Sequence, residues 1–98
     1  VLVDNGVPGD RIRLIEATDD NAIPIDTTLD LVISILSWGF HYPVATYLEQ
    51  AHARLRPGGR LILDVRKDQG GEALLARRFA RVDVVLDLGR AVRLAATR

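Results

Sequence analysis

The chain has 98 residues, and 48% of them are hydrophobic, which is enough for one small domain with a real core. Its 13 basic and 13 acidic residues cancel, so its charge gives no indication of binding to nucleic acid or an anionic membrane. It contains no cysteine, which excludes disulfide frameworks, thiolate zinc sites and a cysteine nucleophile. No apolar run approaches the roughly 20 residues that a membrane-spanning helix requires. We therefore expect a cytoplasmic protein, of unknown oligomeric state, that binds a small molecule and neither nucleic acid nor a membrane.

The first third of the chain contains two predicted strands separated by a polar loop. The chain begins with Val1 rather than Met, and its first ten residues are typical of the end of a helix and a loop, so we expect it to be part of a longer protein. Residues 11–17 (RIRLIEA) alternate polar and apolar side chains, which is the period of a strand. Polar and turn-forming residues follow at 18–28, and residues 29–36 (LDLVISIL) form a nearly continuous apolar run. Such a run is typical of a strand buried on both faces of a parallel sheet.

An amphipathic helix is predicted next, because large or apolar residues recur at helical spacing over residues 44–55. Pro43 suits the first position of this helix. The Pro-Gly-Gly sequence at 57–59 is expected to end it, since glycine accepts the left-handed conformation that commonly closes a helix. Residues 60–66 (RLILDVR) are then predicted to form the next buried strand.

The last third of the chain predicts a second helix and a hairpin. The helix covers residues 71–80, and residues 82–88 and 91–96 form two strands joined by a tight Gly-Arg turn at 89–90. Strands that alternate with helices favour right-handed crossovers and a parallel sheet. The predicted fold is therefore α/β, with a mostly parallel sheet, a C-terminal antiparallel hairpin and helices packed on the sheet.

One stretch of the sequence carries a family resemblance. Residues 29–66 read LDLVISILSWGFHYPVATYLEQAHARLRPGGRLILDVR, in which a D-x-V strand, a helix and an L-R-P-G-G turn before an apolar strand follow one another. This arrangement resembles the fourth strand, the following helix and the fifth strand of class I (Rossmann-like) S-adenosylmethionine-dependent methyltransferases. The resemblance implies that residues 1–98 are the C-terminal part of a single methyltransferase domain with a partial Rossmann-like sheet. It also implies S-adenosyl-L-methionine as the cofactor and a small-molecule acceptor as the substrate.

The part of the family that holds most of the cofactor has no counterpart in this sequence. The family's glycine-rich loop follows its first strand, and the eight glycines of this chain never form G-x-G-x-x-G or G-x-G-x-G after a strand. The acidic residue expected after the second strand, which would hold the ribose hydroxyls, is missing as well. We therefore expect the N-terminal cofactor-binding half to be absent, and the isolated chain to be inactive and to bind the cofactor weakly or not at all.

The resemblance implies cofactor contacts after the first two predicted strands, because ligands of open α/β sheets bind beyond the carboxyl ends of the strands. Thr18 and Asp19 follow the first strand, where a polar or acidic side chain often faces the adenine ring. The alternative for Asp19 is a solvated loop carboxylate. Ser34 and Ser37 lie at the end of the second strand, where a carbonyl or hydroxyl group can hold the cofactor's amino group. The alternative for Ser34 is a small residue packed within the sheet.

Five further residues are expected on the acceptor side. Trp38 would wall the acceptor pocket, or else fill the core between sheet and helix. Gly39 would let the chain pass close to a ligand. His41 and Tyr42 are the catalytic candidates, as a general base or as groups that orient the acceptor, the alternative being a helix entrance. Arg66 would border the pocket at the end of its strand.

Structural roles are expected for two other side chains, His52 and Asp64, and for Arg66 as an alternative to its place at the pocket. His52 is expected to be an exposed polar residue, because it lies opposite the apolar stripe of its helix. Asp64 and Arg66 are two apart on a strand and share one face, which favours an ion pair between them. Two histidines without suitably spaced partners predict no metal site.

The implied function is methyl transfer from S-adenosylmethionine to an acceptor by the full-length protein. The sulfonium supplies its own leaving group, so the enzyme chiefly aligns a nucleophile with the methyl carbon and needs a base only for a poorly ionised acceptor. Two alternatives stay open. One is a non-catalytic α/β interaction module that is complete in 98 residues. The other is a fragment of a nicotinamide-dependent Rossmann oxidoreductase, which would need a G-x-G-x-x-G turn upstream.

Overall fold

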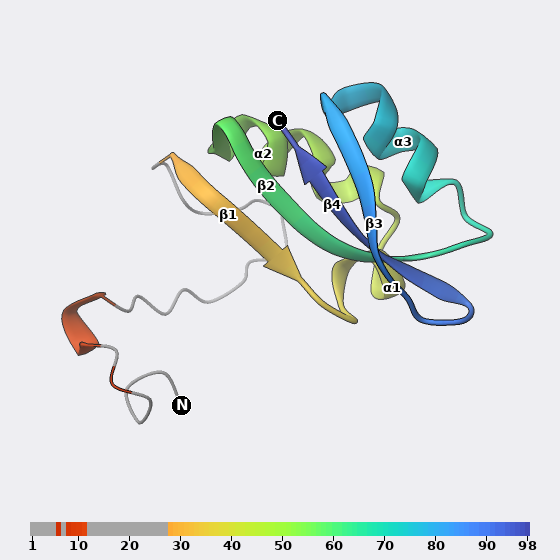
Figure 1. Cartoon of the computed structure of the whole chain (residues 1–98), viewed down its shortest axis with the longest axis horizontal. Helices are drawn as coiled ribbons and strands as arrows, with labels where there is room; N and C mark the ends of the chain where they lie inside the picture. The colour runs from red at the N-terminus through yellow and green to blue at the C-terminus, as the bar shows by residue number, and fades with distance from the viewer. Residues whose placement is uncertain (1–5, 7, 12–27) are drawn as a thin grey trace.

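The computed structural model describes residue 6, residues 8–11 and residues 28–98 (Figure 1). The elements in chain order are η1 (Gly9–Arg11), β1 (Leu29–Ser34), α1 (Trp38–His41), α2 (Ala45–Arg54), β2 (Leu55–Arg66), α3 (Gly71–Arg78), β3 (Arg81–Asp87) and β4 (Ala91–Thr97). The predicted strand at 11–17 lies outside the described residues except for Arg11, which ends the 3-10 helix η1. Within the described part of the chain, no helix is both long and apolar enough to cross a membrane.

The described strands form one mixed sheet in the order β1-β2-β4-β3. The chain is therefore α/β and closes with the predicted hairpin. The prediction of a mostly parallel sheet is wrong for the described residues, because β1 and β2 are parallel whereas β2–β4 and β3–β4 are antiparallel. The reason is that β4 does not stay at the outer edge of the hairpin. It inserts between β3 and β2 and pairs with β2 from Arg60 to Arg66.

The Pro-Gly-Gly sequence has a different role from the one predicted. Helix α2 already ends at Arg54, and Leu55 takes an extended conformation while its N–H still donates to the carbonyl of Ala51. Strand β2 starts at once, and residues 56–59 form a bulge within it, because β1 pairs with β2 through Leu55 and resumes the pairing only at Arg60. Gly58 accepts the positive φ of 82° that this bulge requires. The glycines thus bend a strand rather than close a helix.

The core lies on one face of the sheet, where α1, α2 and α3 pack (Figure 1). Successive strand residues point to opposite faces, and Leu61, Leu63 and Val65 of β2 enter this core. Each fully buried leucine contributes about 1.5–3 kcal/mol through removal of its side chain from water. The opposite face is more open, and on it Leu31 and Ile33 of β1 are 50% and 56% exposed.

His52 is buried, and the prediction that it is exposed is wrong. Only 9% of its surface is accessible, and its ring packs edge-on against Phe79 with 5.1 Å between the ring centroids. The reason is that α3 lies beside α2, so α2 has a second buried side besides the one that faces the sheet. Burial lowers the pKa of His52, and the positive charges of Arg78 and Arg98 lower it further, against a smaller opposing effect of Glu49.

We expect the folded chain to lose stability as the pH falls through the titration range of His52. The pKa of His52 in the folded chain lies below its ordinary value of 6.5, so between these two values the unfolded chain binds more protons than the folded one. The free energy of unfolding should therefore decrease between about pH 7 and pH 5, as urea denaturation at each pH would measure. His52→Gln should make this dependence shallower, whereas His41→Gln, at an exposed position, should retain it. Equal slopes for His52→Gln and the parent chain would contradict the assignment.

Candidate functional site

A cavity of about 280 Å³ lies beyond the carboxyl ends of the two parallel strands, β1 and β2. Three parts of the chain form its walls: the segment that follows β1, the end of β2 and the start of α3. The residues that line it are Gly39, Phe40, His41, Tyr42, Pro43, Val44, Val65, Arg66, Gln69, Gly71 and Leu74. Four of the predicted site residues, Gly39, His41, Tyr42 and Arg66, are thereby brought together. A ligand at this place would lie where open α/β sheets bind theirs.

The short helix α1 turns the chain sharply after β1. The Ser34 hydroxyl oxygen accepts a hydrogen bond from the Trp38 N–H at 3.1 Å, and the Ser37 carbonyl accepts from the N–H groups of Phe40 and His41 at 3.0 and 2.9 Å. These bonds satisfy N–H groups that the first turn of a helix would otherwise leave free. Neither serine lines the cavity. The Ser34 hydroxyl therefore bonds to α1 within the fold, whereas Ser37 is an exposed residue.

Trp38 and Gly39 attach α1 to the body of the domain. Trp38 is only 7% exposed, its indole N–H donates to the Pro43 carbonyl at 3.3 Å, and its ring meets that of Tyr47 edge-on at 5.5 Å. It fills the core and does not line the cavity. Gly39 does line it, but a Cβ atom at this position would lie 2.0 Å from the Asp64 carbonyl oxygen. The contact that requires glycine is thus the one between α1 and β2.

His41 and Tyr42 present the titratable groups of the cavity. His41 is the last residue of α1, Tyr42 follows it, and both are exposed residues. The Tyr42 ring meets that of Tyr47 edge-on at 5.8 Å, which holds the phenol beside the start of α2. An imidazole and a phenol at a cavity wall can exchange a proton with a bound group, or orient it by hydrogen bonds.

Arg66 supplies the positive charge of the cavity. Its guanidinium carbon lies 5.0 Å from the centre of the Phe40 ring, within the range of a cation–π contact. The predicted ion pair between Arg66 and Asp64 is not formed. Asp64 is instead paired with Arg93 of β4, which lies directly opposite it in the sheet, at 2.7 and 3.0 Å. The sequence could not show this partner, because it depends on which strand lies beside β2.

The described residues do not by themselves fit S-adenosylmethionine. Thr18 and Asp19, the candidates for the adenine side, lie outside the described part of the chain. The Ser34 hydroxyl accepts a hydrogen bond from α1, and Ser34 does not line the cavity. No three His, Asp or Glu side chains gather as metal ligands among the described residues. The cavity is better suited to a neutral or anionic molecule.

Among the cavity residues that were not predicted from the sequence, Phe40 and Gln69 can affect binding most directly. Phe40 holds the guanidinium of Arg66, and Gln69 adds an amide at the turn after β2. The rule that ligands bind beyond the ends of parallel strands could have pointed to Gln69.

In comparison with known proteins, no family model and no curated protein matches this chain. The sequence resemblance and the geometry of the cavity are therefore the basis for a functional assignment.

Proposed function

We propose that this chain belongs to an S-adenosylmethionine-dependent methyltransferase and forms the part of its Rossmann-like domain that binds the methyl acceptor. The observation that carries the proposal is the cavity beyond the parallel strands β1 and β2, with His41, Tyr42 and Arg66 on its wall. These side chains belong to the stretch of sequence that carries the family resemblance. The hairpin of β3 and β4, which closes the sheet, also supports the proposal, because the family that residues 29–66 resemble ends its sheet with a hairpin as well.

On this proposal the cofactor supplies an activated methyl group, and this chain orients the atom that receives it. An acceptor in the cavity would lie against Phe40 and Leu74, with His41 and Tyr42 at hydrogen-bonding reach of its polar groups. His41 is the stronger candidate for a general base, since histidine is the side chain that most often accepts a proton in enzymes. An acceptor that is already ionised would need only the orientation.

Isothermal titration calorimetry with S-adenosylhomocysteine tests this proposal on two proteins: the 98-residue chain and the product of the full coding sequence that contains it. We expect micromolar affinity for the full product and no measurable binding to the 98-residue chain, because its sequence lacks the glycine-rich loop that holds the cofactor in the resembling family. A full product without affinity, or one without a glycine-rich turn after a strand upstream of Val1, would contradict the proposal. Tight binding by the 98-residue chain would contradict the assignment of this part to the acceptor side.

A further inference from the structure

A second cavity, of about 360 Å³, adjoins the first one at the end of the sheet that carries the hairpin turn. Phe40 and Arg66 line both cavities, so the two are neighbours. Most of the lining of the second cavity is apolar, and its charged groups are two arginines. The residues that line it are Leu36, Phe40, Arg66, Leu88, Arg90 and Ala91.

The pairing of β2 with β4 brings the two arginines together. Arg66 lies opposite Ala91 in the register, and the carbonyl of Arg90 accepts a hydrogen bond from the N–H of Lys67 at 3.1 Å. Neither Arg66 nor Arg90 forms an ion pair with a carboxylate in the described part of the chain. Asp68 lines an adjoining hollow with them but pairs with neither.

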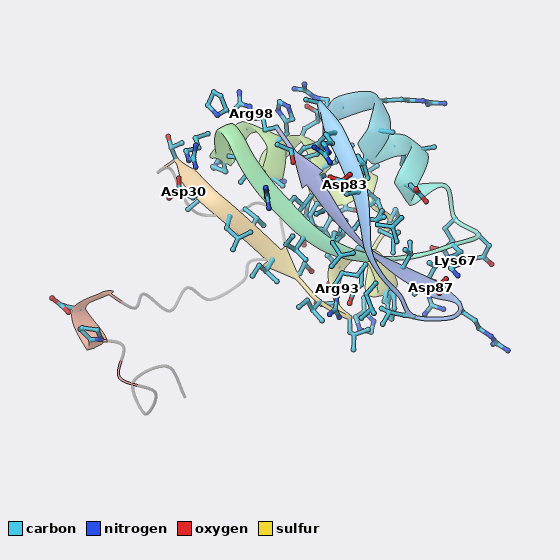
Figure 2. All side chains as sticks on the ribbon, in the orientation of Figure 1. Asp30, Lys67, Asp83, Asp87, Arg93 and Arg98 are labelled. Atoms are coloured by element: carbon cyan, nitrogen blue, oxygen red, sulfur yellow. The ribbon has the colours of Figure 1, made fainter. Side chains whose placement is uncertain are left out.

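Other cations of this region do have carboxylate partners. Figure 2 shows Lys67 beside Asp87, with 2.8 Å between the Nζ and Oδ1 atoms. Arg93 is paired with the buried Asp64. Within this part of the described chain, Arg66 and Arg90 have no such partner, and both line the apolar cavity. Two arginines that line one cavity can together attract an anion.

The backbone at the mouth of the cavity is held in an unfavourable conformation. Leu36 has a φ of 53°, in the left-handed region that non-glycine residues rarely adopt. Its N–H donates to the Oδ2 atom of Asp64 at 3.0 Å, and Arg93 fixes that carboxylate from the other side. Leu36 is nevertheless 55% exposed. The strained backbone of this residue is therefore not offset by burial of its side chain in the core. Backbone strain of this kind is typical of binding sites.

We propose that this second cavity binds an organic anion, whose apolar body packs against Leu36, Phe40 and Leu88 and whose carboxylate lies between Arg66 and Arg90. Arginine suits this role because its planar group can donate two parallel hydrogen bonds to a carboxylate. The identity of the anion rests on the proposed function: it is the methyl acceptor. Its reacting atom reaches the first cavity beside His41 and Tyr42.

The test is an NMR titration of the 15N-labelled chain with 2-naphthoate. We expect shifts of the Nε–Hε signals of Arg66 and Arg90 and of the backbone amides of Leu36 and Phe40. Arg66→Ala and Arg90→Ala should each weaken binding about tenfold or more, the size expected for a charge-assisted hydrogen bond. Arg77→Ala, on an exposed part of α3 away from both cavities, is the matched control and should leave the affinity unchanged. The dispersion of the amide spectrum shows that each variant is folded.

Two further probes identify the chemistry that is recognised. The neutral 2-naphthamide should bind at least about tenfold more weakly than 2-naphthoate, because it lacks the charge. If 2-naphthyl phosphate bound more tightly than 2-naphthoate, the proposal that the site recognises a carboxylate would be contradicted. Equal binding of the amide and the acid, or an affinity that survives both arginine replacements, would contradict the anion site. The full product could fail to bind S-adenosylhomocysteine while 2-naphthoate still binds at these arginines. In that case the anion site would stand, and only its role as the methyl-acceptor site would be contradicted.

Discussion

Replacing Asp64 by asparagine should lower the free energy of unfolding by about 3 kcal/mol, because breaking one side of a buried ion pair leaves the other charge without a partner. The Asp64 side chain is 0% exposed and that of Arg93 is 23% exposed. Because Arg93 keeps some contact with water, we expect the lower end of the range for such pairs. The variant also weakens the bond to the Leu36 N–H, which holds the mouth of the second cavity. Urea denaturation followed by circular dichroism measures the loss.

Asp83→Asn is the matched control for this replacement. Asp83 is paired with Arg81 at 2.8 Å, but both side chains are about half exposed or more, at 47% and 74%. Exposed ion pairs contribute about 0–1 kcal/mol, since water screens them, so the control should unfold almost as the parent chain does. If the two variants lose equal stability, burial does not strengthen the Asp64–Arg93 pair.

Asp64 should also make the chain sensitive to acid. Its pKa is held below the ordinary value of 3.8, first by the hydrogen bonds from Arg93 and then by the Leu36 N–H, although burial opposes this. A carboxylate with a lowered pKa stabilises the folded state above the pKa of the unfolded chain. That contribution is lost as the pH falls through the folded value. The parent chain should therefore lose stability more steeply below pH 3.8 than Asp64→Asn does.

Gly39→Ala should be the most damaging replacement of a glycine, with a loss of about 3 kcal/mol. The new Cβ atom would lie 2.0 Å from the carbonyl oxygen of Asp64 and 3.2 Å from Cγ1 of Val65. The first obstacle is the backbone of β2, which is paired with a strand on each side and cannot shift without breaking those pairs. Helix α1 would have to move instead, and with it the cavity wall that carries His41. Thermal and urea denaturation measure the loss of stability.

Gly9→Ala is the control for Gly39→Ala. A Cβ atom at Gly9 would have nothing within 4 Å, and the φ angle of Gly9 is not in the left-handed region. A change at such an exposed position is expected to alter stability by no more than about 0.5 kcal/mol. A Gly39→Ala variant as stable as Gly9→Ala would show that α1 does not need its close approach to β2.

The local elements could be predicted from the sequence because their signals are local. The apolar run at 29–36 gave β1 (Leu29–Ser34), and the helical spacing at 44–55 gave α2 (Ala45–Arg54). The turn between β3 and β4 was marked by Gly89, which has a φ of 90° and donates its N–H to the side chain of Asp87. Four of the cavity residues could be placed as well, because the end of a parallel strand is recognisable in the sequence.

The sequence by itself determined these helices, strands and turns, and the class of fold that they form. Only the tertiary structure decided which elements became neighbours. The insertion of β4 beside β2 gave Asp64 the partner Arg93 and brought Arg90 to Arg66, and the packing of α3 on α2 buried His52. The physical reason is that periodicity reports which side of an element is apolar, whereas partners across a sheet or between helices depend on how distant segments pair.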